Sequence, residues 1–72
     1  MEEVLRQFGV NVRQARLARG WTQEDLSQAT DLAVVQVSRI ERGKREIRLT
    51  TLLRLLSALD VPAEELLRGL RS

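Results

Sequence analysis

The sequence contains no cysteine and no histidine, and it has only one proline, one phenylalanine and one tryptophan among its 72 residues. Without cysteine, neither a disulfide framework nor a thiolate metal site is possible. Without histidine, the chain lacks the commonest general base and the commonest metal ligand. We therefore expect no metal site and no cofactor.

Long apolar runs, a signal peptide and strand patterns are also missing. No segment approaches the about 20 consecutive apolar residues that span a bilayer. The acidic start, Met1-Glu2-Glu3, is unlike a secretory leader. Sustained alternation of apolar and polar residues does not occur, so β-strands are not expected. These absences predict a cytoplasmic, all-α protein.

Leucine is the most abundant residue, with thirteen copies. A single domain over 1–72 buries only about 60% of the surface of its unfolded chain, so its stability needs a core of large apolar residues or a partner subunit. The net charge is +2, but residues 13–48 hold eight basic and five acidic side chains, and the flanking segments hold four basic and five acidic ones. The middle segment therefore suits a polyanion, although a charge-rich surface is also normal for a small soluble domain.

Apolar residues recur with the helical period along the whole chain. The pattern predicts helices over about 2–19, 22–29, 33–42, 49–59 and 62–70. Gly20 and Gly43 stand where left-handed helix ends belong. Thr22 and Asp25 form a start that resembles a capping box, and Pro62 suits the first position of the last helix.

The second and third predicted helices are short, and a turn of about three residues, at 30–32, joins them as in a helix-turn-helix. This spacing alone is not specific, because helical hairpins are common. The residues in and around the motif closely resemble the phage-repressor-like helix-turn-helix family, of the Cro/repressor or XRE type, over residues 8–67. The matching residues are Arg13, Arg16, Gly20-Trp21-Thr22-Gln23-Glu24-Asp25-Leu26, Val37-Ser38-Arg39-Ile40-Glu41-Arg42-Gly43-Lys44, Leu49-Thr50-Thr51-Leu52, Ala58-Leu59, Val61 and Glu65-Leu66-Leu67.

The resemblance implies a compact five-helix bundle that acts as a sequence-specific, DNA-binding transcription regulator. It implies that Gln23, at the start of the second helix, binds a DNA phosphate, and the neighbouring Thr22 is a further candidate for a phosphate contact. The free N–H groups and the positive dipole end of a helix favour an anion there. The alternative is that Gln23 is simply a polar residue of the first turn. The resemblance also implies that Arg16 and Glu41 form an ion pair between the first and third helices, which is a structural role and not a catalytic one.

On a helix over 33–42, Val34, Val35, Ser38 and Arg42 share the outward face, with Arg39 at its edge. The valines have three interpretations: contact with thymine methyl groups, a hydrophobic surface for a protein partner, or partial burial against the second helix. Arg39 is the strongest candidate for a base contact, because arginine can bind guanine through two hydrogen bonds. A phosphate contact or a solvated charge is the alternative, and Ser38 is a weaker candidate.

Basic residues around the end of the third helix are candidates for phosphate contacts, which provide affinity and register without reading sequence. These residues are Arg42, Lys44 and Arg45. Arg13 is a further candidate. Arg19 is either a phosphate contact or a solvated charge at the helix end.

The sequence departs from the family pattern at several positions. Asp31 replaces the usual glycine of the turn, but aspartate tolerates the left-handed conformation better than most residues. Ala33 replaces the usual serine or threonine cap, which leaves the start of the third helix open by one or two residues, with Asp31 as a substitute cap. Ile47-Arg48 stands where the family often has Pro-Ser, and Leu56 where it often has alanine.

Leucines of the fourth predicted helix cover an arc of about 160°, which is wider than one core contact needs. In a homodimer, the leucines that the core does not need would form the contact between the two subunits. Such a dimer would read a palindrome whose half-sites lie about 34 Å apart. The candidate interface residues are Leu53, Leu56, Leu66, Leu67 and Leu70. The alternative is that these leucines only complete the core.

Segment 41–49 and the single domain resemble the controller proteins of restriction–modification systems, which are free-standing homodimers.

An enzyme is not expected. The adjacent carboxylates at 24–25 and 64–65 lie at predicted helix starts, where they favour the helix dipole, and no nucleophile or metal set accompanies them. The alternative function is an antitoxin or protein-interaction module on the same fold. Loss of the phosphate-binding residues would favour that alternative, but this chain retains them. RNA polymerase is a further partner if the protein activates transcription.

Overall fold

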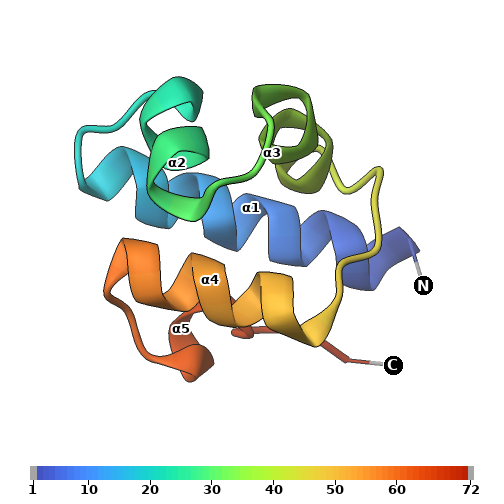
Figure 1. Ribbon diagram of the computed structural model, residues 1–72. Coiled ribbons are helices and arrows are strands. Elements are labelled where there is room, and N and C mark those ends of the chain that lie inside the picture. The colour runs from blue at the N-terminus through green and yellow to red at the C-terminus, as the bar shows by residue number, and fades with distance from the viewer. Residues whose placement is uncertain (1, 72) are drawn as a thin grey trace.

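The computed structural model describes residues 2–71, which form five helices and no β-strand. The helices are α1 (Glu2–Ala18), α2 (Gln23–Thr30), α3 (Val34–Glu41), α4 (Leu49–Leu59) and α5 (Ala63–Leu66). The long α1 runs through the middle, with α2 and α3 on one side of it and α4 and α5 on the other (Figure 1). This arrangement confirms the predicted all-α bundle. None of the helices within residues 2–71 is long and apolar enough to cross a membrane.

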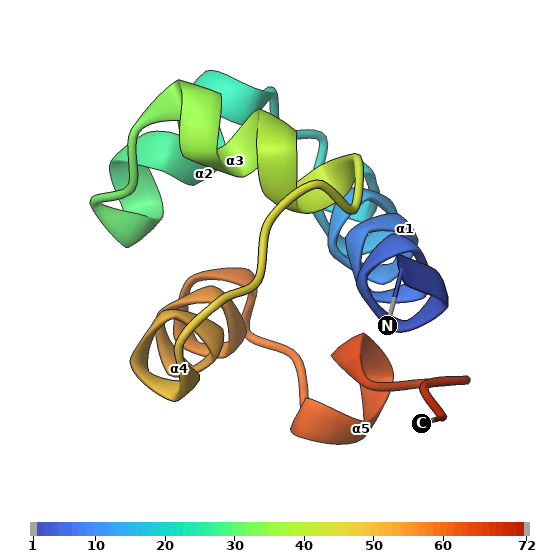
Figure 2. The same cartoon turned by 90° about the vertical axis from the view of Figure 1, so that its right-hand side faces the viewer.

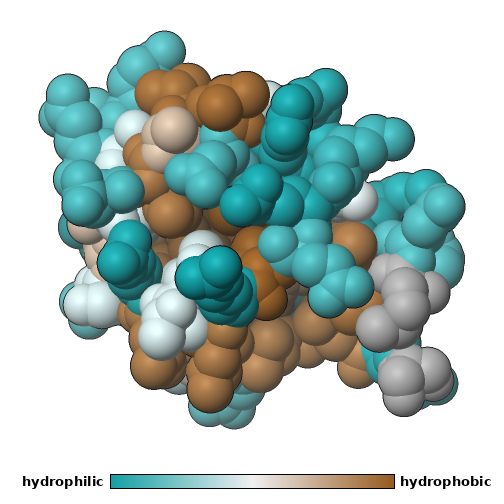
Figure 3. Space-filling view, turned by 45° about the vertical axis from the view of Figure 1, so that its right-hand side comes forward, coloured by the Kyte–Doolittle hydropathy of each residue, from teal (hydrophilic) through white to brown (hydrophobic). Residues whose placement is uncertain are grey.

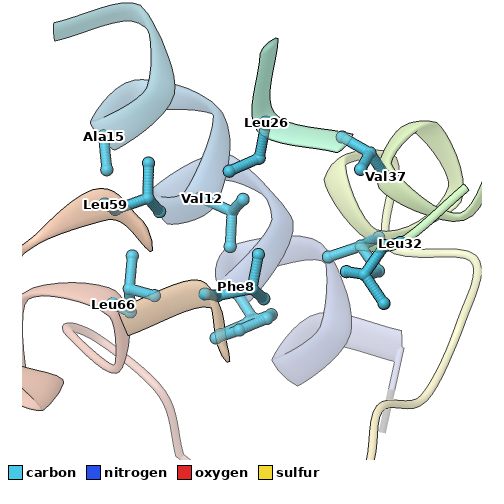
Figure 4. Close-up of a cluster of buried hydrophobic side chains, with 10 residues drawn as sticks. Phe8, Val12, Ala15, Leu26, Leu32, Val37, Leu59 and Leu66 are labelled. Carbon is cyan, nitrogen blue, oxygen red and sulfur yellow. The ribbon is translucent and has the colours of Figure 1, made fainter. Parts of the chain in front are cut away.

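One apolar cluster joins all five helices, and α1 contributes its centre (Figure 4). Its members are Phe8, Val12, Ala15, Leu26, Leu32, Val37, Ile40, Leu55, Leu59 and Leu66. A fully buried leucine or valine contributes about 1.5–3 kcal/mol by leaving water. Because α1 touches α3, α4 and α5, this helix is the support on which the helix-turn-helix is placed.

The start of α2 is the capping box that the sequence predicts. The Asp25 N–H donates to Thr22 Oγ1 at 3.1 Å, and the Thr22 N–H donates to Asp25 Oδ2 at 2.9 Å. The predicted turn at 30–32 is displaced by one residue, because Thr30 is helical and its hydroxyl donates to the Leu26 carbonyl at 2.6 Å. Asp31 ends the helix in the left-handed conformation, with φ 61° and ψ 27°, so the turn forms without glycine.

The start of α3 does not use Asp31 as its cap. Ala33 occupies the N-cap position, and the Ala33 N–H donates to Gln36 Oε1 at 3.0 Å. Of the two hydrogen bonds of a capping box, Gln36 accepts the one from the N-cap N–H. The other bond needs a polar side chain at the N-cap, which alanine lacks. The helix begins at Val34 and ends at Glu41, one residue inside the predicted bounds at each end.

The last helix is shorter than predicted. Pro62 is its N-cap, with ψ 155°, and α5 ends at Leu66 instead of residue 70. The reason is Asn11, a buried residue of α1, whose Nδ2 donates to the Leu66 carbonyl at 2.8 Å and to the Arg68 carbonyl at 2.9 Å. These bonds bind the end of the chain to α1 in a turn, and Gly69 then adopts φ 79°.

Gly9 allows α1 and α3 to approach closely. A Cβ at this position would lie 2.5 Å from the carbonyl oxygens of both Ile40 and Glu41. Only a hydrogen fits there, so the end of α3 rests directly on the α1 backbone. This contact sets the height of α3 above the core.

Candidate nucleic-acid interface

Helix α3 lies at the edge of the molecule beside α2, on the side away from α4 and α5 (Figure 2). Its inward residues Val37, Ile40 and Glu41 are buried. Val34 is 38% exposed and Val35 is 56% exposed. Val35 is thus the more exposed of the two valines.

The polar residues of α3 follow in the next turns. Arg39 and Arg42 are exposed, and Ser38 is half-buried. Arg39 has no ion-pair partner among residues 2–71, so its guanidinium is available to a ligand. The outer face of α3 is therefore apolar at its start and cationic toward its end.

The structure brings Arg16 and Glu41 together in a buried pair. Arg16 Nε donates to Glu41 Oε2 at 2.7 Å, and Arg16 Nη2 donates to Glu41 Oε1 at 3.0 Å. Their side chains are 8% and 3% exposed. The hydrogen bonds to Glu41 raise the pKa of Arg16 despite the opposing effect of burial. Arg16 Nη1 also donates to the Trp21 carbonyl at 2.7 Å, so one side chain connects α1, the approach to α2 and the end of α3.

Gln23 joins the same network. Its Nε2 donates to Glu41 Oε1 at 3.1 Å, and the side chain is half-buried at the start of α2. An amide nitrogen carries two hydrogens, so one N–H is held by Glu41 and the other remains for a ligand. Thr22 Oγ1 already caps Asp25, which leaves only its hydroxyl hydrogen for a phosphate. The network thus orients the Gln23 amide beside the N-terminus of α2.

Arg42, Lys44 and Arg45 are exposed around the end of α3 and in the loop that follows. None of them forms an ion pair with any described residue. Arg42 lies at the C-cap, where its Nε donates weakly to the Ser38 carbonyl at 3.4 Å. Arg13 is exposed on α1.

Arg19 is exposed and makes two contacts within the protein. Its Nη1 donates to the Leu59 carbonyl at 3.2 Å, and its guanidinium lies 4.4 Å from the centroid of the Trp21 ring. This residue therefore binds the end of α1 to the end of α4. Its partner lies 40 positions further along the chain, and no local pattern indicates that contact.

A polar cleft of about 610 Å³ lies between α3 and the start of α4. Its lining includes Gln36, Arg45, Arg48 and Arg54. The sequence analysis did not assign Arg48 or Arg54 to the interface. Arg48 is the N-cap of α4 and Arg54 lies within that helix, and both line the cleft together with the carboxylates of Asp31 and Glu46.

The candidate dimer leucines fall into three groups. Leu53 and Leu67 are 55% and 39% exposed. Leu56 and Leu70 are partly buried and pack against the core. Leu66 is fully buried at 0% exposure, so its assignment to an interface is wrong, because a residue without exposed surface cannot contact a second subunit. The sequence analysis omitted Leu49, which is 72% exposed at the start of α4.

These features define a class of protein. The chain belongs to the helix-turn-helix family, whose sequence profile matches residues 12–66. This match confirms the resemblance found in the sequence.

Particular relatives follow from the comparison of sequences and structures. The restriction–modification controller protein C.AhdI from Aeromonas hydrophila has 39% sequence identity and a TM-score of 0.83, over 86% of this chain and 94% of that one. The hypothetical transcription factor NHTF from Neisseria has 35% identity and a TM-score of 0.82, over 93% and 78%. A Neisseria hypothetical transcription factor, from Neisseria meningitidis serogroup B, is 37% identical over 57 residues, which are 79% of this chain. The chain spans about half, 54%, of the length of that relative.

Proposed function

We propose that this protein is a sequence-specific, double-stranded DNA-binding transcription regulator that inserts α3 into the major groove. The observation that carries the proposal is the outer face of α3, where exposed valines and Arg39, which has no ion-pair partner among residues 2–71, accompany a group of phosphate-binding candidates near the end of the helix. Gln23 contacts Glu41 at the end of α3, and the exposed Lys44 and Arg45 follow in the next loop. Membership of the helix-turn-helix family and the likeness to a controller protein support the same function.

The proposed roles divide by chemistry. Base edges are read by Val34, Val35, Arg39 and, more weakly, Ser38, because apolar groups contact thymine methyls and arginine binds guanine. Phosphates are bound by Thr22, Gln23, Arg42, Lys44, Arg45 and Arg13, which position the protein on the duplex. No step of this function requires catalysis, and we propose that the protein is not an enzyme.

We further propose that two copies bind one palindromic operator. Leu49 and Leu53 lie one helical turn apart on α4 and are both more than half exposed. Figure 3 shows hydrophobic side chains in two areas, one along the upper edge on the side of α2 and α3, and one along the lower edge on the side of α4. The protein measures 30 × 23 × 21 Å, so two copies in contact match the scale of the about 34 Å that separates successive major-groove sites. Control of a restriction–modification system is the regulatory role that the likeness to C.AhdI supports.

The test is a selection of binding sites from a randomised duplex library, followed by a salt titration on the selected sequence. We expect a palindromic consensus and a log–log salt slope of about −0.9 per neutralised phosphate. Arg39→Ala should relax the consensus at one position per half-site. Arg45→Ala should weaken binding to all sequences and reduce the salt slope by about one per subunit. Arg68→Ala, an exposed cation at the far end of the chain, is the control and should change neither.

A library that yields no consensus would contradict the proposal. If all binding stays weak and disappears with salt, a search for a protein partner of α3 replaces the search for an operator.

A further inference from the structure

The first turn of α3 carries no exposed polar side chain. Ala33, Val34 and Val35 are consecutive and exposed. Gln36 is half-buried, and its carbonyl oxygen accepts the Ala33 N–H at 3.0 Å. The first exposed polar side chain of the helix is Arg39, one turn later.

This pattern matters because the N-terminal residues of a recognition helix are the ones that contact base edges. Valine has no hydrogen-bond donor or acceptor, so it cannot distinguish the polar groups of the bases. The apolar group that unmodified DNA presents in the major groove is the C5 methyl of thymine. Arg39 and Arg42 follow Val35 by four and seven positions and would hold a polyanion against this side of α3.

Resting on the proposed function, we infer that Val34 and Val35 make binding depend on the 5-methyl group of a pyrimidine in each half-site. The valines contact the methyl and not the neighbouring exocyclic atom. They are therefore expected to accept 5-methylcytosine, which carries the same methyl, and to discriminate against cytosine. The affinity for such a site thus responds to cytosine methylation at the position that faces α3.

The experiment uses the operator obtained by selection. Each thymine of a half-site is replaced in turn by uracil, which removes only the methyl, and equilibrium binding is measured for the full chain. One buried methyl corresponds to an about fourfold change in the binding constant. We expect an about fourfold loss at one or two thymines and none at the others. At a sensitive position, a 5-methylcytosine·guanine pair should bind about fourfold more tightly than a cytosine·guanine pair.

Two variants connect the effect to the valines. Val35→Ala should bind the thymine and uracil duplexes equally well at the sensitive position, because the contact that detects the methyl is absent. Val10→Ala is the matched control, since Val10 is a valine of α1 with 41% exposure. This control should keep the full sensitivity to uracil.

The outcomes separate this inference from the proposed function. If no operator is selected, the DNA-binding function itself fails. If an operator is bound specifically but tolerates uracil at every position, the function stands and the methyl dependence is overturned. Uracil sensitivity that persists unchanged in both Val35→Ala and Val34→Ala would also overturn it, because another group would then detect the methyl.

Discussion

A buried polar network joins helices α1, α2 and α3, whereas α4 is held to the rest of the bundle by a different kind of interaction. Between α1, α2 and α3, a buried ion pair and its neighbours form directional bonds, with Glu41 accepting from both Arg16 and Gln23. In α4, the interactions with the rest of the bundle are mainly apolar, and Leu49 and Leu53 remain exposed. Directional bonds specify one geometry, whereas apolar contact is not directional and scales with the area covered.

The difference matches the two tasks proposed for the molecule. A helix that reads base edges must be held at a fixed height and angle, and the network and Gly9 do this for α3. A helix that packs against a second subunit needs exposed apolar surface, and α4 has such surface at Leu49 and Leu53. Four predictions test this division, from the largest expected effect to the smallest.

Glu41→Ala should cause the largest loss of stability. It leaves the Arg16 guanidinium buried without its partner, and breaking a buried pair in this way costs about 3–5 kcal/mol. Urea denaturation followed by circular dichroism measures the loss. Glu46→Ala removes an exposed carboxylate of the next loop and should stay within about 0.5 kcal/mol of the wild type. A Glu41→Ala protein as stable as that control would show that the pair does not hold α3 in place.

Gly9→Ala should be the next most damaging substitution. The added Cβ meets two carbonyl oxygens at 2.5 Å, so α3 must move away from α1, at a cost of about 1–3 kcal/mol. DNA affinity should fall as well, at a temperature where the variant is fully folded. Gln14→Ala changes an exposed residue of the same helix and serves as the control. Unchanged stability in Gly9→Ala would contradict the close approach of the two helices.

Leu53→Glu should weaken self-association while the subunit stays folded. Placing a charge on both sides of a symmetric interface should raise the dimer dissociation constant at least about tenfold, or ~1.4 kcal/mol. Sedimentation equilibrium gives the constant, and circular dichroism reports the fold. Leu17→Glu is the matched control, because Leu17 on α1 is 52% exposed and Leu53 is 55% exposed. An equal effect of the two substitutions would mean that α4 is not the interface.

The smallest effects are expected for Arg19 and Arg13, which have different proposed roles. Arg19→Ala removes the bond to the Leu59 carbonyl and the contact with Trp21, so stability should fall by about 0.5–1 kcal/mol, with DNA affinity unchanged. Arg13→Ala should do the reverse, leaving stability unchanged and weakening DNA binding. Thermal denaturation and a binding titration on both variants decide between these outcomes. If Arg19→Ala instead weakens DNA binding, its assignment to the structure is wrong.

Local patterns predicted the parts of the fold that depend on neighbouring residues. The capping box at Thr22 and Asp25 and the left-handed Asp31 involve bonds within a few positions, and these features appear as predicted. The family resemblance placed Arg16 near Glu41. Gly9, Asn11 and the final position of Arg19 were not predicted, because each depends on a segment that folding brings from a distant part of the chain.

The sequence by itself determined the helical class, the approximate helix positions and the inward and outward sides of α3, since the period of apolar residues specifies these directly. The tertiary structure decided which leucines are exposed to solvent. Periodicity shows that the leucine surface of α4 and α5 is wider than one contact, but only packing against α1 buries Leu66 and leaves Leu49 in solvent. Burial depends on every segment that packs around a side chain. The helical period shows only which side of its own helix a residue occupies, and not which other segments cover that side.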